Sequence, residues 1–95
     1  MTSEQWEYLT MFMWAEASNE GAMELIQERW PQWKNIPKFT AEALIPKLNE
    51  YGKEGWELVS MEPVFVERNG KVWFTGYTGS HANSYFCALK RRLPD

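Results

Sequence analysis

The sequence contains one cysteine and one histidine, and these two scarcities exclude several classes of protein. A single thiol, Cys87, cannot form a disulfide within the chain, and Cys87 with His81 alone cannot supply the ligands of a structural zinc site. We therefore expect no metal and no cofactor. Because disulfides are typical of oxidising compartments, we also expect the chain to work in the reducing cytoplasm.

Long hydrophobic runs and an excess of positive charge are missing as well. No stretch approaches the roughly 20 apolar residues that span a bilayer, and the first residues lack the layout of a signal peptide. The net charge of −3 gives no positive field to attract nucleic acid or an anionic membrane, so we expect neither as a partner. We interpret the basic residues 90–92 as charges that keep a strand edge from pairing with another chain, rather than as a site that binds single-stranded bases.

Aromatic side chains are the residues that the sequence has in excess. They make up 16% of the 95 residues and include six tryptophans, whereas the hydrophobic fraction of 44% is ordinary for a globular domain. A chain of this length buries one modest core, which limits how many wide rings it can cover. We expect a partner chain to cover some of them, most simply in a two-fold homodimer.

Alternating side chains predict the first strand over residues 6–14. The strand is apolar on both faces, so we expect it to lie inside a sheet or to be covered on both sides. The two faces consist of Trp6, Tyr8, Phe12 and Trp14, and of Leu9, Met11 and Met13.

Two helices are predicted after this strand. Residues 22–29 form a short amphipathic helix within residues 16–38, which we interpret as an insertion between the first strand and the main helix. Thr40 is the expected N-cap of the main helix, whose apolar residues recur at helical spacing up to Tyr51. Pro46 either kinks this helix or stands at its start, because proline lacks a backbone donor.

Two glycines are predicted to carry the chain from the main helix into the sheet. We expect Gly52 to end the helix in a left-handed conformation, and Gly55 to form a second turn. The period of two then returns from Trp56, with Pro63 marking a bulge or an edge.

Asn69 and Gly70 predict a hairpin with a two-residue type I′ turn, and residues 84–92 form a last strand. The expected fold is a single α+β domain over residues 1–95. It has a small antiparallel sheet of about four strands with one main helix on one face, plus the short helical insertion. The cross-strand pairs expected in the hairpin are Val66 with Trp73 and Phe65 with Phe74.

A resemblance rests on three runs of residues. L-N-E-Y-G-K-E-G-W-E-L-V at residues 48–59, with W-E-Y at residues 6–8 and Y-F-C-A-L-K-R at residues 85–91, resembles a family of small bacterial and phage domains of unknown function. The resemblance implies a helix packed on a small antiparallel sheet. It implies no activity and carries over no catalytic residues.

The loop over residues 76–83 is the candidate ligand site, because its hydroxyl groups and small residues could present donors to a ligand. The simpler interpretation is a solvated connection between strands. The residues of such a small-ligand or nucleotide pocket would be Tyr77, Thr78, Ser80, His81, Asn83, Trp30 and Trp33.

Three functions are ranked on this basis. The first is a non-enzymatic binding or interaction module that forms a homo-oligomer, with a protein or a small ligand as a possible further partner. The second is the small-ligand or nucleotide binder. The third is an enzyme with His81 as acid or base, for which no catalytic residues are assigned because the orienting partners are not fixed by sequence. The remaining candidates are interpreted as surface charge, namely Glu54, Glu57, Glu62 and Glu67.

Overall fold

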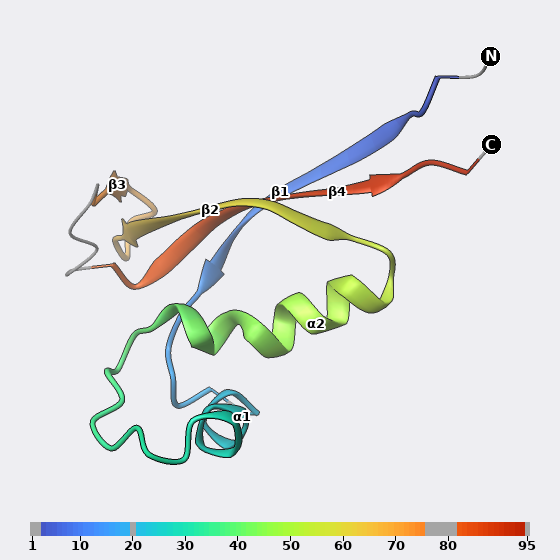
Figure 1. Ribbon diagram of the computed structural model, residues 1–95. Coiled ribbons are helices and arrows are strands. Elements are labelled where there is room, and N and C mark those ends of the chain that lie inside the picture. Colours follow the sequence, from blue (N-terminus) through green and yellow to red (C-terminus); the bar gives the residue numbers. More distant parts are fainter. Residues whose placement is uncertain (1–2, 20, 76–81, 95) are drawn as a thin grey trace.

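The computed structural model describes residues 3–19, 21–75 and 82–94, and it shows the expected α+β fold with one four-stranded antiparallel sheet (Figure 1). The strand order is β1-β4-β2-β3. The strand predicted over residues 6–14, the helix over 22–29 and the strand over 84–92 are confirmed. In chain order the elements are β1 (Trp6–Trp14), α1 (Ala22–Arg29), the 3-10 turn η1 (Ala41–Leu44), α2 (Ile45–Lys53), β2 (Glu57–Val66), β3 (Val72–Phe74) and β4 (Ser84–Arg92).

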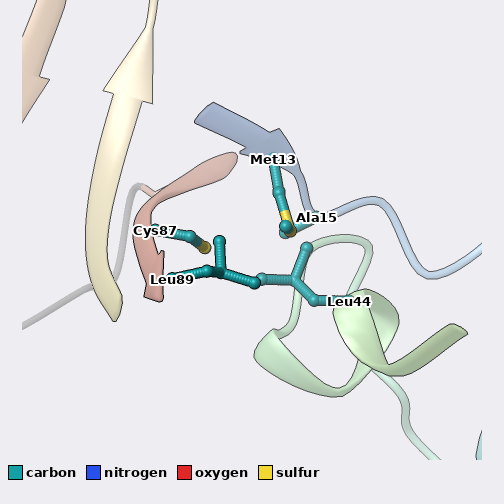
Figure 2. Packing of buried hydrophobic residues seen from close by; sticks show 5 residues of the cluster. All are labelled: Met13, Ala15, Leu44, Cys87 and Leu89. Carbon is teal, nitrogen blue, oxygen red and sulfur yellow. The ribbon is translucent and has the colours of Figure 1, made fainter. Parts of the chain in front are cut away.

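The hydrophobic core lies between one face of the sheet and the start of the main helix. Met13 and Ala15 reach it from β1 and the residue after it, Leu44 reaches it from η1, and Cys87 and Leu89 reach it from β4. Figure 2 shows these side chains converging from strands and helix. The partly buried residues around them are Leu9, Met11, Leu48, Tyr51, Trp56, Met61 and Tyr85.

The main helix starts near Pro46 and is not kinked by it. α2 begins at Ile45, so Pro46 stands in the first turn, where a backbone N–H would have no helical partner. Thr40 precedes η1, but its side chain forms no bond to the helix backbone. Its hydroxyl lies instead within hydrogen-bond distance of the Glu42 carboxylate.

The end of α2 is a Schellman motif with Gly55 in the left-handed position. Gly55 has a φ of 91°, and its N–H donates to the Gly52 carbonyl at 3.0 Å. The Trp56 N–H donates to the Tyr51 carbonyl at 3.0 Å. The predicted turn at Gly55 is confirmed. The predicted left-handed conformation at Gly52 is wrong, because the helix continues through Gly52 to Lys53.

The β2–β3 hairpin has a three-residue loop, so the predicted type I′ turn is wrong. The Glu67 N–H donates to the Lys71 carbonyl at 2.8 Å across this loop. A type I′ turn needs a positive φ at both central residues. The φ of Gly70 is positive, at 88°, but the φ of Asn69 is not. The extra loop residue shifts the predicted register by one position. The observed pairs are Val64 with Phe74, Phe65 with Trp73 and Val66 with Val72.

β2 carries its bulge earlier than Pro63. The register with β4 shifts between Leu58 and Ser60, which leaves Val59 as the extra residue. Pro63 pairs regularly with β4, and its carbonyl accepts the Thr75 N–H at 3.4 Å. Pro63 has no N–H, and that group would point to the β3 side of β2. β3 ends opposite Val64, so this side of β2 becomes a sheet edge at Pro63. Of the two predicted alternatives, the edge is therefore confirmed and the bulge is wrong.

β1 is an edge strand that pairs only with β4 in the described sheet. The prediction that β1 lies inside the sheet or is covered on both sides is therefore wrong. A period of two determines which residues share a face. It does not determine which strands become neighbours, because that depends on pairing between residues far apart in the sequence.

Candidate interaction surface

The sheet face directed away from the core forms a surface that we call the open face. Alternate residues of β1 point into the core, so the residues between them point the other way. Figure 1 shows α2 on one side of the sheet, opposite this surface. The register with β4 and β2 extends the open face over three strands. It comprises Trp6, Tyr8, Thr10, Phe12 and Trp14 of β1, Phe86, Ala88, Lys90 and Arg92 of β4, and Glu57, Ser60 and Glu62 of β2.

Aromatic rings on the open face are exposed to solvent. Tyr8 is 68% exposed, Phe12 49% and Trp14 48%. Phe12 and Phe86 face each other across β1 and β4, with ring centroids 5.1 Å apart. Proteins that act alone rarely expose a continuous apolar surface, so this arrangement is typical of a surface that a partner covers. The alternating pattern of the sequence placed the β1 rings on one face. It could not show that no other part of the described chain covers that face.

The basic residues 90–92 are divided between the two faces of the sheet. Lys90 lies on the open face, with its Nζ 4.3 Å from the centroid of the Trp6 ring. Arg92 has a guanidinium nitrogen 3.8 Å from a carboxylate oxygen of Glu4. Lys90 and Arg92 thus share the open face and each has a neighbour of its own, whereas Arg91 lies on the other face.

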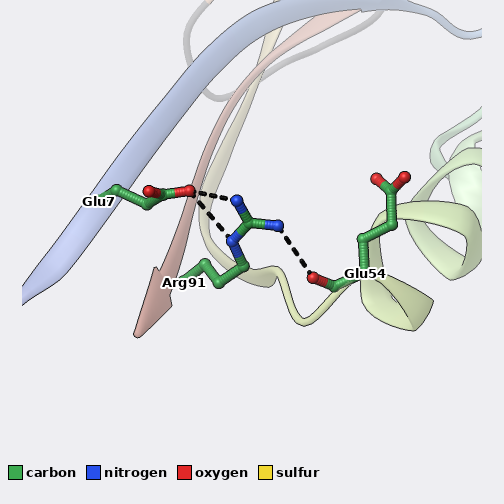
Figure 3. A network of polar contacts seen from close by, with 3 residues as sticks. All are labelled: Glu7, Glu54 and Arg91. Atoms are coloured by element: carbon green, nitrogen blue, oxygen red, sulfur yellow. Dashed lines mark hydrogen bonds and ion pairs between the residues drawn. The ribbon is translucent and has the colours of Figure 1, made fainter. Parts of the chain in front are cut away.

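Arg91 points to the opposite face and ties three elements together (Figure 3). Its Nε donates to the Glu7 carboxylate of β1 at 3.0 Å, and a terminal nitrogen donates to the Glu54 carbonyl after α2 at 3.1 Å. The guanidinium carbon lies 4.4 Å from the centroid of the half-buried Trp56 ring. The role of Arg91 is therefore structural.

Asn83 completes the sheet. Its side-chain oxygen accepts the Val66 N–H at 3.0 Å, and its side-chain nitrogen donates to the Val66 carbonyl at 3.0 Å. The amide thus takes the place of a backbone pair beyond the start of β4, and Asn83 is only 6% exposed. The other predicted ligand residues of this loop lie outside the described residues: Tyr77, Thr78, Ser80 and His81. The ligand role of that loop and the acid/base role of His81 stay predictions.

Trp30 and Trp33 contact each other just after α1. Their rings meet edge to face, with centroids 6.4 Å apart. Asn83 lines a shallow cleft with Trp14 and the β2 end of the hairpin, and neither Trp30 nor Trp33 belongs to that cleft. The described residues therefore do not bring the predicted ligand set together.

A second cleft, of about 610 Å³, lies between β1 and the helices. Four consecutive β1 residues, 11–14, line it, so it opens at the outer edge of the strand. Leu44 and Tyr51 line the helix side, and Lys47 and Glu50 add one charge of each sign. The edge of β1 thus has a hollow of mixed apolar and charged lining on its core side, and exposed rings on its other side.

Groups with chemical reactivity are dispersed. Within residues 3–19, 21–75 and 82–94, no three histidine, cysteine or acidic side chains converge as metal ligands would. Cys87 is fully buried, and this burial raises the pKa of its thiol, which makes it a poor nucleophile. Glu67 accepts the indole N–H of Trp73 at 2.9 Å. The other acidic candidates are exposed: Glu54, Glu57 and Glu62.

No protein-family model, curated protein or solved structure matches this chain. The resemblance of the three sequence runs to small bacterial and phage domains therefore stays a prediction. In the part of the chain that the structure describes, no helix has the length and apolar character needed to cross a bilayer. The proposed function therefore rests on the open face and on the free edge of β1.

Proposed function

We propose that this protein is a non-enzymatic interaction module that binds a second copy of itself through β1. One observation carries the proposal: the exposed rings of Tyr8, Phe12 and Trp14 stand on a strand that is also the free edge of the sheet. Covering aromatic surface stabilises association by roughly 25 cal/mol for each Å² of apolar area removed from water. An unpaired strand edge adds backbone hydrogen bonds to the same contact.

The charge distribution of β1 favours a partner of the same kind. Glu7 is the one charged residue of the strand, and it is bound to Arg91 on the core side of the sheet. The part of the open face that β1 builds is therefore uncharged. Nucleic acid and anionic membranes require a positive surface, whereas a second copy presents the same uncharged, aromatic strand in return.

A two-fold dimer in the cytoplasm is the simplest form of this proposal. Two-fold dimers are the most common closed assemblies of identical chains. The buried, unpaired Cys87 is compatible with a reducing compartment and supports the cytoplasmic setting.

Light scattering across a dilution series tests the proposal. We expect the parent to have twice the monomer mass of 11.2 kDa at high micromolar concentration and to approach 11.2 kDa on dilution. Phe12→Ser should shift the midpoint of this transition to higher concentration. Phe74→Ser is the matched control, because Phe74 is 64% exposed but lies on β3, at the opposite edge of the sheet. A parent mass of 11.2 kDa at every concentration would contradict self-association.

A further inference from the structure

The backbone groups of β1 that face its free edge belong to the residues of the open face. The Ala15 N–H donates to the Asn83 carbonyl at 2.9 Å, and the Leu93 N–H donates to the Gln5 carbonyl at 2.9 Å. Backbone direction alternates along a strand, so the odd-numbered positions between these two bonds direct their N–H and C=O groups toward β4. The residues that direct theirs to the free edge are Trp6, Tyr8, Thr10, Phe12 and Trp14.

This edge has one of the devices that keep strands from pairing with another chain, a charge on the core side at Glu7, and Arg91 binds that charge. Natural edge strands are protected by short length, prolines, lysines or bulges. At the opposite edge of this sheet β3 has three residues, and β2 has a bulge and Pro63. β1 has nine residues with no proline, glycine or lysine, and its register with β4 is regular from end to end. Its backbone is therefore available for another strand.

We infer that two copies of this chain pair β1 with β1 in antiparallel orientation, about a two-fold axis at Thr10. The pair joins both four-stranded sheets into one continuous sheet with the helices of both copies on the same face. This inference rests on the proposed function, since it specifies how self-association takes place. On the open face, Thr10 lies opposite Thr10 of the second copy, Tyr8 opposite Phe12, and Trp6 opposite Trp14.

The side chains of β1 match in this register. Each aromatic ring lies opposite another ring, which is a favourable cross-strand pair. On the core side, Leu9 lies opposite Met11 of the second copy, and Glu7 lies opposite Met13, so no like charges oppose each other. All nine residues of β1 take part.

The neighbouring registers match less well. An axis at Leu9 places Trp14 opposite Glu4 of the second copy, and an axis at Met11 places Trp6 opposite Glu16. Either shift leaves two β1 residues of each copy without a β1 partner and sets a ring against a carboxylate. The Thr10 axis is thus the most complementary arrangement that keeps the two core faces together.

The cleft beside β1 borders the junction on the core side, and its lining combines apolar residues with Lys47 and Glu50. Met11 lines this cleft of about 610 Å³, and Leu9 of the second copy is its cross-strand neighbour in the Thr10 register. The register therefore places an apolar side chain of the second copy beside Met11, at the border of the cleft. Pairing of the edges extends the core of each copy toward the other.

Disulfide trapping measures the register directly. Directly opposed residues of an antiparallel pair that exchange hydrogen bonds have Cα atoms about 5.5 Å apart, within the range of a disulfide. We expect Thr10→Cys to give a covalent dimer under mild oxidation. Ser60→Cys is the matched control, because Ser60 lies level with Thr10 on the open face but on β2. Five strand spacings then separate the two copies of residue 60, or about 24 Å. The native Cys87 is buried and common to both variants.

Proline at the same position tests whether the dimer needs the backbone N–H groups of the free edge. The N–H that Thr10→Pro removes faces the free edge, so the pairing with β4 is kept, and far-UV circular dichroism should match the parent. We expect this variant to raise the dissociation constant of the dimer by about 100-fold or more, because proline blocks the central bonds of the junction. Thr10→Val keeps the N–H and the β-branched side chain, and should leave the dissociation constant within about threefold of the parent.

The outcomes separate the inference from the proposed function. A disulfide at residue 10 without one at residue 60, together with a dimer weakened by proline, supports pairing about Thr10. A dimer that persists in Thr10→Pro, with no disulfide in Thr10→Cys, overturns the edge inference but leaves self-association standing. A parent that is monomeric at every concentration overturns both.

Discussion

At the scale of single residues, Gly55 and Gly52 are three positions apart and should respond to alanine in opposite ways. Gly55 has a φ of 91°, and a Cβ there would lie 3.3 Å from Cδ of Arg91, which Glu7 and Glu54 hold in place. We expect Gly55→Ala to lower the free energy of unfolding by about 1–2 kcal/mol. Gly52 is helical with nothing within 4 Å, so Gly52→Ala should raise it by about 0.5–1 kcal/mol. Urea denaturation compares the variants, and equal shifts of the same sign would show that Gly55 is not strained.

At the scale of elements, Asn83 joins the end of β2 to the start of β4. Asn83→Ala leaves the N–H and carbonyl of Val66 without their partner at a buried site, so we expect a loss of about 1–3 kcal/mol in the free energy of unfolding. Asn69→Ala is the control, because Asn69 accepts only the exposed Lys71 N–H, and its loss should cost about 0.5 kcal/mol or less. Thermal unfolding of both variants measures the difference. A variant at Asn83 as stable as the parent would return this residue to the ligand-site hypothesis.

The elements themselves were largely predictable from sequence, because local periodicity determines them. β1, α1 and β4 have the predicted bounds, since each alternates or repeats over its whole length. The hairpin register was missed because a two-residue and a three-residue loop share the Asn-Gly signal. Whether one or both of those residues adopt positive φ is decided by the strands that flank them.

At the scale of the whole molecule, the sequence predicted an excess of aromatic rings but not where they lie. Tyr8 and Phe12 were expected to be covered, whereas the strand order leaves β1 at the edge with one face in solvent. Strand order depends on which distant segments pair, and the pattern within a strand carries no information on it. The structural role of Asn83 was missed for the same reason, because its partner, Val66, is 17 residues away.

Hydrogen exchange of the β1 amides at two protein concentrations tests most directly whether a second copy pairs with β1. The amides of Leu9 and Met11 face β4, so they should exchange slowly whether the protein is concentrated or dilute. The amides of Tyr8, Thr10 and Phe12 face the free edge. We predict that they exchange slowly in the dimer and about 100-fold or more faster after dilution to the monomer, because only a second chain can bond them. Fast exchange of these three amides at a concentration where light scattering shows a dimer would contradict the assignment of β1 as the contact strand.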